Sequence, residues 1–133
     1  MYYSNNRFRK NEKLCSRSVI TRLFESGNSF NYNHFRILWM ESPGILPFPA
    51  QTAISVGKKS FRAATQRNRI KRLLRETWRI NKGTIYKKLE KIDKQIVIMI
   101  IYRSDNIPDY RTMSEEMGKM VERFSMHLDK SFN

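Results

Sequence analysis

Three clusters of hydrophobic residues along the chain have the length and composition of β-strands. Residues 35–40 (FRILWM) are rich in aromatic and aliphatic side chains, and residues 51–57 (QTAISVG) alternate between apolar and polar or small side chains. Residues 95–103 (QIVIMIIYR) contain the longest apolar run. The last cluster is apolar on both faces, which is typical of a strand in the middle of a sheet or beneath a helix. A loop rich in proline, residues 42–49 (SPGILPFP), separates the first two clusters.

Hydrophobic residues at helical spacing predict two helices in the first two thirds of the chain. Residues 13–26 form the first helix, which ends before Gly27, a residue that commonly terminates helices. Its hydrophobic side is made by Val19, Ile20, Leu23 and Phe24. The second helix, residues 63–81, is strongly basic.

A third helix is predicted near the end of the chain, where residues 112–115 (TMSE) match a capping box. Its apolar stripe consists of Met113, Met117, Met120, Val121, Phe124 and Leu128. The elements then follow the order helix, strand, strand, helix, strand, helix. This order predicts an α+β fold, with helices packed on a small sheet. Without repeats or long linkers, residues 1–133 are predicted to form a single domain.

The net charge of the chain is the strongest indication of its partner. The formal net charge is +14 and the isoelectric point is near 10.3. Residues 58–91 hold 13 of the 26 Lys and Arg residues but only two of the 12 Asp and Glu residues, Glu76 and Glu90. Repulsion on this scale predicts a polyanionic partner.

The basic helix has two opposite faces when its residues are placed 100° apart. The apolar face contains Ile70, Leu73, Leu74, Thr77 and Trp78, and the basic face contains Asn68, Lys71, Arg72, Arg75 and Arg79. Arginine outnumbers lysine on the basic face, and its planar guanidinium can bind two phosphate oxygens or stack on a base. We therefore expect the helix to bind nucleic acid, with Asn68 forming specific hydrogen bonds.

Other uses of a basic helix are a solvated surface, a DNA-reading helix and a membrane-surface helix. Solvated faces usually mix both signs of charge. A DNA-reading helix normally belongs to an all-helical unit, whereas strands flank this one. Its apolar face is expected to be needed for the core, which disfavours the membrane surface.

The sequence contains no recognisable catalytic or metal-binding constellation. His34 and His127 have no spaced partners, and Cys15 is the single cysteine. Together with an N-terminus that lacks the apolar segment of a signal peptide, this cysteine usage predicts a cytoplasmic protein. The longest apolar run, residues 96–102, is too short to span a membrane, so no membrane partner is expected.

Residues 56–79, VGKKSFRAATQRNRIKRLLRETWR, resemble the bacterial ribonuclease P protein family. That family carries a strand that ends in a lysine pair, followed by an RNR-x-KR-x-x-R-E helix. FRKNEKL (8–14) and LFESG (23–27) resemble the family's opening helix, and residues 96–103 its later strand. The motifs cover about residues 7–103, and the last helix matches in pattern only.

The resemblance implies a two-layer α/β sandwich with a small mixed sheet and a left-handed βαβ crossover, as in a domain of a ribosomal protein. It implies that the basic helix faces the catalytic RNA subunit of ribonuclease P. The residues implied for that contact are Arg67, Asn68, Arg69, Lys71, Arg72, Arg75 and Arg79.

A cleft between the first helix and the sheet is implied to receive the single-stranded 5′ leader of precursor tRNA. The residues implied for it are Ile20, Phe24, Phe35, Lys58 and Lys59, with Ile20 where the family commonly has an aromatic residue. Aromatic side chains would stack on bases and lysines would follow the phosphates.

The resemblance also implies that the RNA subunit cleaves the substrate with bound Mg²⁺, so no catalytic residue and no protein metal ligand are assigned. The partners expected are the RNA subunit and precursor tRNA, without an obligate protein partner. Two alternatives remain: a structural or chaperone RNA-binding protein of the ribosome, and a self-sufficient nuclease. The absence of a carboxylate cluster disfavours the nuclease.

Overall fold

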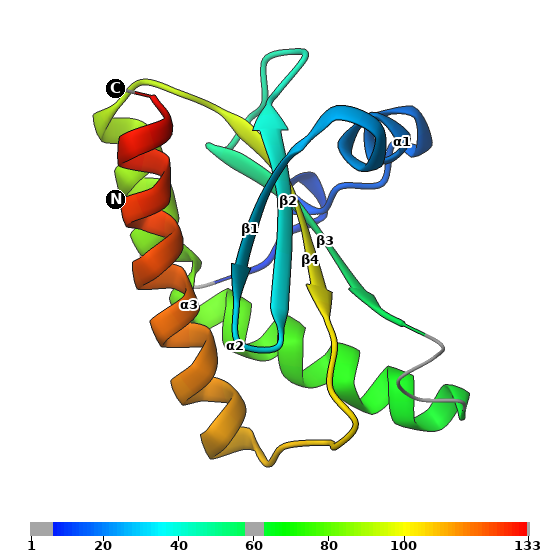
Figure 1. Ribbon diagram of the computed structural model, residues 1–133. Coiled ribbons are helices and arrows are strands. Elements are labelled where there is room, and N and C mark those ends of the chain that lie inside the picture. The colour runs from blue at the N-terminus through cyan, green and yellow to red at the C-terminus, as the bar shows by residue number, and fades with distance from the viewer. Residues whose placement is uncertain (1–6, 58–62, 133) are drawn as a thin grey trace.

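In the computed structural model, residues 7–57 and 63–132 are described, and they form one sheet with helices on both faces (Figure 1). The strands are β1 (Asn28–Tyr32), β2 (Phe35–Glu41), β3 (Ala50–Val56) and β4 (Ile96–Tyr102), in the order β1-β2-β4-β3. β4 pairs antiparallel with β2 and parallel with β3. The three predicted strands are confirmed, and β1 is an additional edge strand.

Two hydrophobic layers follow from the alternation of side chains along the central strands. Ile96, Ile98 and Ile100 of β4 lie under the helices α2 (Ala64–Lys91) and α3 (Tyr110–Ser131). Val97 and Met99 pack with Leu23 of α1 (Arg17–Ser26). This helix lies on the opposite side of the sheet (Figure 1). This explains why β4 is apolar on both faces. The predicted α+β sandwich is confirmed.

The chain passes from β3 through α2 to β4 in a left-handed crossover (Figure 1). Parallel strands joined by a crossover are right-handed in nearly all proteins, so this is an unusual connection. It places the N-terminal end of α2 beside the end of β3 (Figure 1). The residues between them, 58–62, lie outside the described part of the chain.

Helix α2 is longer than predicted and continues for ten residues beyond residue 81. Its second half buries Ile85, Tyr86 and Leu89 completely. The prediction stopped early because Lys82 and Gly83 interrupt the apolar pattern. Lys82 is in fact buried and ion-paired with Glu12, so a charged residue occupies a core position.

The ion pair between Lys82 and Glu12 joins α2 to the N-terminal segment. Glu12, in the short 3-10 helix η2 (Lys10–Glu12), also accepts hydrogen bonds from the hydroxyl of Tyr86 (2.6 Å) and the backbone N–H of Arg9 (2.9 Å). Lys82 donates a second hydrogen bond to the carbonyl of Arg7. Burial lowers the pKa of Lys82, although its hydrogen bond with Glu12 acts in the opposite direction.

The N-terminal segment accounts for the late start of α1, which begins at Arg17 and not at residue 13. The N–H of Leu14 donates to the carbonyl of Thr52 and Lys13 forms a parallel bridge with the same residue, so the short stretch between η2 and α1 runs along β3. α1 ends where predicted. A Cβ at Gly27 would lie 2.6 Å from the carbonyl oxygen of Leu23, which excludes a side chain at that position without a shift.

Helix α3 begins at Tyr110, before residues 112–115, so the prediction that these residues form a capping box is wrong. The cap is Asp109, whose side chain accepts a hydrogen bond from the backbone N–H of Thr112 at 2.8 Å. A carboxylate cap satisfies a free N–H and complements the helix dipole. All six residues of the predicted apolar stripe are buried, so the prediction of the core face is confirmed.

His127 of α3 makes a polar contact with the sheet: its Nε2 accepts a hydrogen bond from Nε1 of Trp39 at 3.1 Å. Burial lowers the pKa of His127 below its ordinary value of 6.5. As the pH falls through 6.5, the unfolded chain therefore takes up the proton first, and protonation in the folded chain would remove the acceptor. We expect the free energy of unfolding to fall as the pH drops below about 6.5 because of this residue.

Urea unfolding of the wild type and of His127→Gln at several pH values measures this effect. Glutamine retains an acceptor but does not titrate, so the variant should show a flatter pH dependence. His34→Gln is the control, because His34 is exposed and contacts Glu116. Equal pH dependence in the wild type and His127→Gln would contradict the expectation.

Candidate RNA-binding surface

The N-terminal half of α2 presents a row of cations to solvent. Asn68, Arg69, Arg72 and Arg75 are exposed, whereas Lys71 and Arg67 are half-buried. Ile70, Leu74 and Trp78 on the other side of the helix are fully buried. In the structure, we use the name basic face for Arg67, Asn68, Arg69, Lys71, Arg72 and Arg75, which adds Arg67 and Arg69 to the residues that helical spacing placed there and leaves out Arg79. Because its backbone is fixed by the core, these side chains are positioned without a further ordering of the helix.

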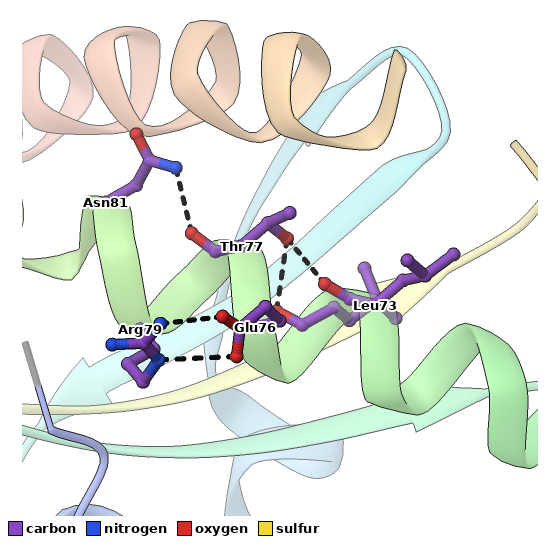
Figure 2. Close-up of polar contacts among 6 residues, drawn as sticks. Leu73, Glu76, Thr77, Arg79 and Asn81 are labelled. Carbon is purple, nitrogen blue, oxygen red and sulfur yellow. Dashed lines mark hydrogen bonds and ion pairs between the residues drawn. The ribbon is translucent and has the colours of Figure 1, made fainter. Parts of the chain in front are cut away.

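Arg79, the last residue predicted for this face, is already paired. Its guanidinium donates two hydrogen bonds to Glu76, at 2.6 and 3.3 Å (Figure 2). The hydrogen bond from Arg79 lowers the pKa of Glu76, and the same bond raises the pKa of Arg79. Glu76 therefore reduces the charge that Arg79 offers to a partner, and the basic face effectively ends at Arg75.

Polar side chains on the α3 side of the helix bond to its own backbone. The hydroxyl of Thr77 donates to the carbonyl of Leu73 at 2.8 Å, and the amide of Asn81 donates to the carbonyl of Thr77 at 2.8 Å (Figure 2). Both side chains point toward α3, and Arg79 and Glu76 lie on the opposite side (Figure 2). The hydrogen bonds allow polar residues to occupy the tight interface between the two helices.

A cavity of about 280 Å³ lies beside the basic face. Its lining comes from the N-terminal segment, from β3 and from α2: Phe8, Lys13, Leu14, Cys15, Thr52, Ala53, Ile54 and Arg75. Arg75 thus belongs to both the basic face and the cavity. The resemblance implied a cleft between the first helix and the sheet, whereas this cavity is lined by the segment before α1, by β3 and by α2, which are more than 20 residues apart along the chain. Lys13, which belongs to the segment FRKNEKL, lines this cavity, but nothing in the sequence singled it out as a binding residue.

The residues expected to bind the leader have different environments. Phe24 of α1 is 56% exposed, and Ile20 is half-buried against the hydrophobic layer under α1. Lys58 and Lys59 lie outside the described residues. Phe35 is fully buried under α2 and α3, with its ring 5.4 Å from that of Tyr102. The expectation for Phe35 is therefore corrected: it faces the side of the sheet opposite α1 and supports the core.

Comparison with known proteins identifies the family. The family model described as Ribonuclease P matches residues 8–125. The ribonuclease P protein component of Porphyromonas gingivalis is 32% identical over 122 residues, which cover 92% of this chain and 89% of that protein. The chain belongs to the ribonuclease P protein family. The corresponding protein of Chlorobaculum tepidum is 29% identical, with 88% and 82% of the two chains covered.

Solved structures of ribonuclease P proteins share this fold. The protein from Thermotoga maritima matches with a TM-score of 0.64 at 27% identity, covering 84% of this chain and 96% of that one. The Staphylococcus aureus protein matches with a TM-score of 0.64 at 21% identity, covering 92% and 98%. As a member of the family, the chain is a protein component of ribonuclease P, an endoribonuclease of tRNA processing.

Potential metal-binding side chains are not clustered in the described part of this ribonuclease P chain. Within residues 7–57 and 63–132, no three His, Cys, Asp or Glu side chains are grouped so that they could hold a metal ion. His34 bonds to Glu116 and His127 to Trp39.

Among residues 7–57 and 63–132, no helix has both the length and the apolarity that crossing a bilayer requires.

Proposed function

We propose that this chain binds the catalytic RNA subunit of ribonuclease P through the basic face of α2. The observation that carries the proposal is the exposure of Asn68, Arg69, Arg72 and Arg75 along one side of a helix whose other side is buried. Like charges at this spacing repel, and phosphates would convert that cost into binding free energy. Asn68, between two arginines, can hydrogen-bond to base or backbone. We place the protein in the cytoplasm.

The single-stranded leader of precursor tRNA is the second ligand in this proposal. Arg75 connects the basic face to the cavity lined by Phe8 and Lys13, and Phe24 offers an exposed ring on α1. Lys58 and Lys59 would add charge between β3 and α2. A leader bound there would contact rings through its bases and cations through its phosphates, without dependence on sequence.

The chemistry is proposed to belong to the RNA subunit, which would hold the Mg²⁺ ions that activate water for phosphodiester hydrolysis. No three His, Cys, Asp or Glu side chains of residues 7–57 and 63–132 are grouped as a ligand set, and we therefore assign no protein ligand to Mg²⁺. Glu76 and Glu12, which lie on or near α2, are instead bonded to Arg79 and Lys82. The role of this chain is then to bind and orient RNA.

Cleavage of a precursor tRNA at low Mg²⁺ by the matching RNA subunit tests the proposal. The reaction is run with both components and with each alone. Strong stimulation in the mixture only is the expected result. A lack of stimulation, with co-sedimentation of the protein with ribosomal particles, would favour a ribosomal or chaperone role. Cleavage by the protein alone would indicate a self-sufficient nuclease.

Phe24→Ala is expected to weaken binding of precursor tRNA with a long leader by about fivefold or more, because base stacking on an aromatic ring is lost. Folding should not change, since the ring is largely exposed. Affinity is measured with leaders of one and of several nucleotides. Ile45→Ala is the matched control, because Ile45 is 98% exposed on the loop between β2 and β3. An equal effect of Phe24→Ala on both substrates would exclude a leader contact.

A further inference from the structure

A groove of about 300 Å³ lies between the edge strand β1 and the C-terminal half of α3. The residues that line it are Phe30, Asn31, Tyr32, Arg123, Met126, His127 and Lys130. Three of these seven, Met126, His127 and Lys130, lie beyond residues 8–125, which the family model matches. The groove is therefore partly built from residues that the general family pattern does not describe.

Aromatic rings form much of the groove. The ring of Phe30 lies 4.9 Å from the imidazole of His127, and the guanidinium of Arg123 lies 5.6 Å from the centre of the Tyr32 ring. Phe30, Tyr32 and His127 are each only partly buried, and Met126 is exposed. A planar ligand could contact such a surface by stacking, as a nucleic acid base does on aromatic side chains.

The charge of the groove has one sign. Arg123 and Lys130 are exposed cations about two helical turns apart on α3, and no carboxylate is among the lining residues that the structure describes. The nearby carboxylate of Asp129 is bonded to Lys88 at 2.6 Å on α2. The groove is thus complementary to an anion that carries flat apolar groups.

We propose that this groove binds an unpaired segment of the catalytic RNA subunit, with bases against the rings and phosphates at Arg123 and Lys130. The segment must be unpaired, because stacking on protein rings requires bases that are not enclosed in a duplex. An acidic peptide would satisfy the two cations but would leave the rings without a stacking partner.

The groove is separate from the surface proposed for the leader. β1 and β3 are opposite edges of the sheet, about 14 Å apart at the usual spacing of strands. The cavity beside Arg75 includes residues of β3, and the groove includes residues of β1. α2 and α3 cover the same face of the sheet, and the C-terminal half of α3 lies beside the C-terminal half of α2, where Lys88 bonds to Asp129. The groove thus lies on the helical layer that carries the basic face and away from the cavity proposed for the leader, which favours the RNA subunit as the occupant.

Nuclear magnetic resonance of the ¹⁵N-labelled full chain, titrated with hexaadenylate, tests the chemistry of the site. We expect saturable shifts of amides in β1 and in the last turns of α3. These shifts should be lost in Arg123→Gln/Lys130→Gln, whose exposed positions leave the core intact, and kept in Lys87→Gln/Lys91→Gln. An abasic strand of equal charge should bind the groove at least about fivefold more weakly. Groove shifts that are absent, that survive in the first variant, or that are equal with the abasic strand would overturn the inference.

Binding to the whole RNA subunit tests the source of the segment. This arm depends on the proposed function, and we expect Arg123→Gln/Lys130→Gln to bind about tenfold more weakly with a salt slope reduced by about one to two. Its dependence on leader length should match that of the wild type. Unchanged affinity, or a loss only with long leaders, would overturn the inference alone. A wild-type chain that does not bind the RNA subunit would instead overturn the proposed function.

Discussion

Replacing Arg69, Arg72 and Arg75 together by alanine is expected to weaken binding to the catalytic RNA subunit by about a hundredfold to a thousandfold. Each exposed guanidinium can donate charge-assisted hydrogen bonds to phosphates, and losing each costs on the order of 1–1.5 kcal/mol. The slope of log affinity against log salt should decrease by about two to three, since fewer counterions are released. Filter binding or fluorescence anisotropy over a range of salt concentrations measures both quantities.

A charge-matched control is available within the same chain. Lys87, Lys91 and Lys119 are exposed and lie on the distal half of α2 and on α3. Their replacement by alanine removes the same charge but should change the affinity by less than about tenfold. Equal losses in the two triple variants would show that net charge, and not the position of the arginines, determines binding.

Lys82→Met is expected to destabilise the protein by about 3–5 kcal/mol, because it leaves the buried carboxylate of Glu12 without its cation. Lys82 and Glu12 are both almost completely buried. The same substitution removes the hydrogen bond that holds the carbonyl of Arg7. Chemical denaturation measured by circular dichroism gives the change in the free energy of unfolding.

Two further variants isolate the buried pair. Lys88→Met removes a partly exposed ion pair with Asp129 and should cost about 1 kcal/mol or less. The double variant Lys82→Met/Glu12→Gln should be more stable than the sum of the two single changes predicts, because no unpaired charge remains. Strict additivity would mean that the two side chains do not interact in the folded protein.

The elements with strong hydrophobic patterns were predicted well from the sequence. β2, β3 and β4 lie within one residue of the predicted strands, and the stripe of α3 is buried as expected. These predictions depend only on local periodicity. The exposed cations of the basic face follow from the same periodicity, because burying Ile70, Leu74 and Trp78 turns the arginines outward.

Features that depend on distant partners could not be predicted. β1 (NSFNY) is mostly polar and is a strand because it pairs with β2. Lys82 resembles a surface residue until Glu12, 70 positions away, is placed beside it. Phe35 was assigned to the wrong face because a strand that is apolar at most positions does not indicate which side α1 covers.

The first turn of α2 affects the stability of the protein when no RNA is bound. Ala63 provides no side-chain cap, and the first turn contains no acidic residue, so no carboxylate from that turn offsets the positive end of the helix dipole next to Arg67. An acidic first turn would make the free chain more stable and a worse ligand for a polyanion. The chain without bound RNA is therefore less stable than it could be, and RNA bound to the folded state would raise its free energy of unfolding. Under the proposed function, unassembled protein would be the form most open to proteolysis.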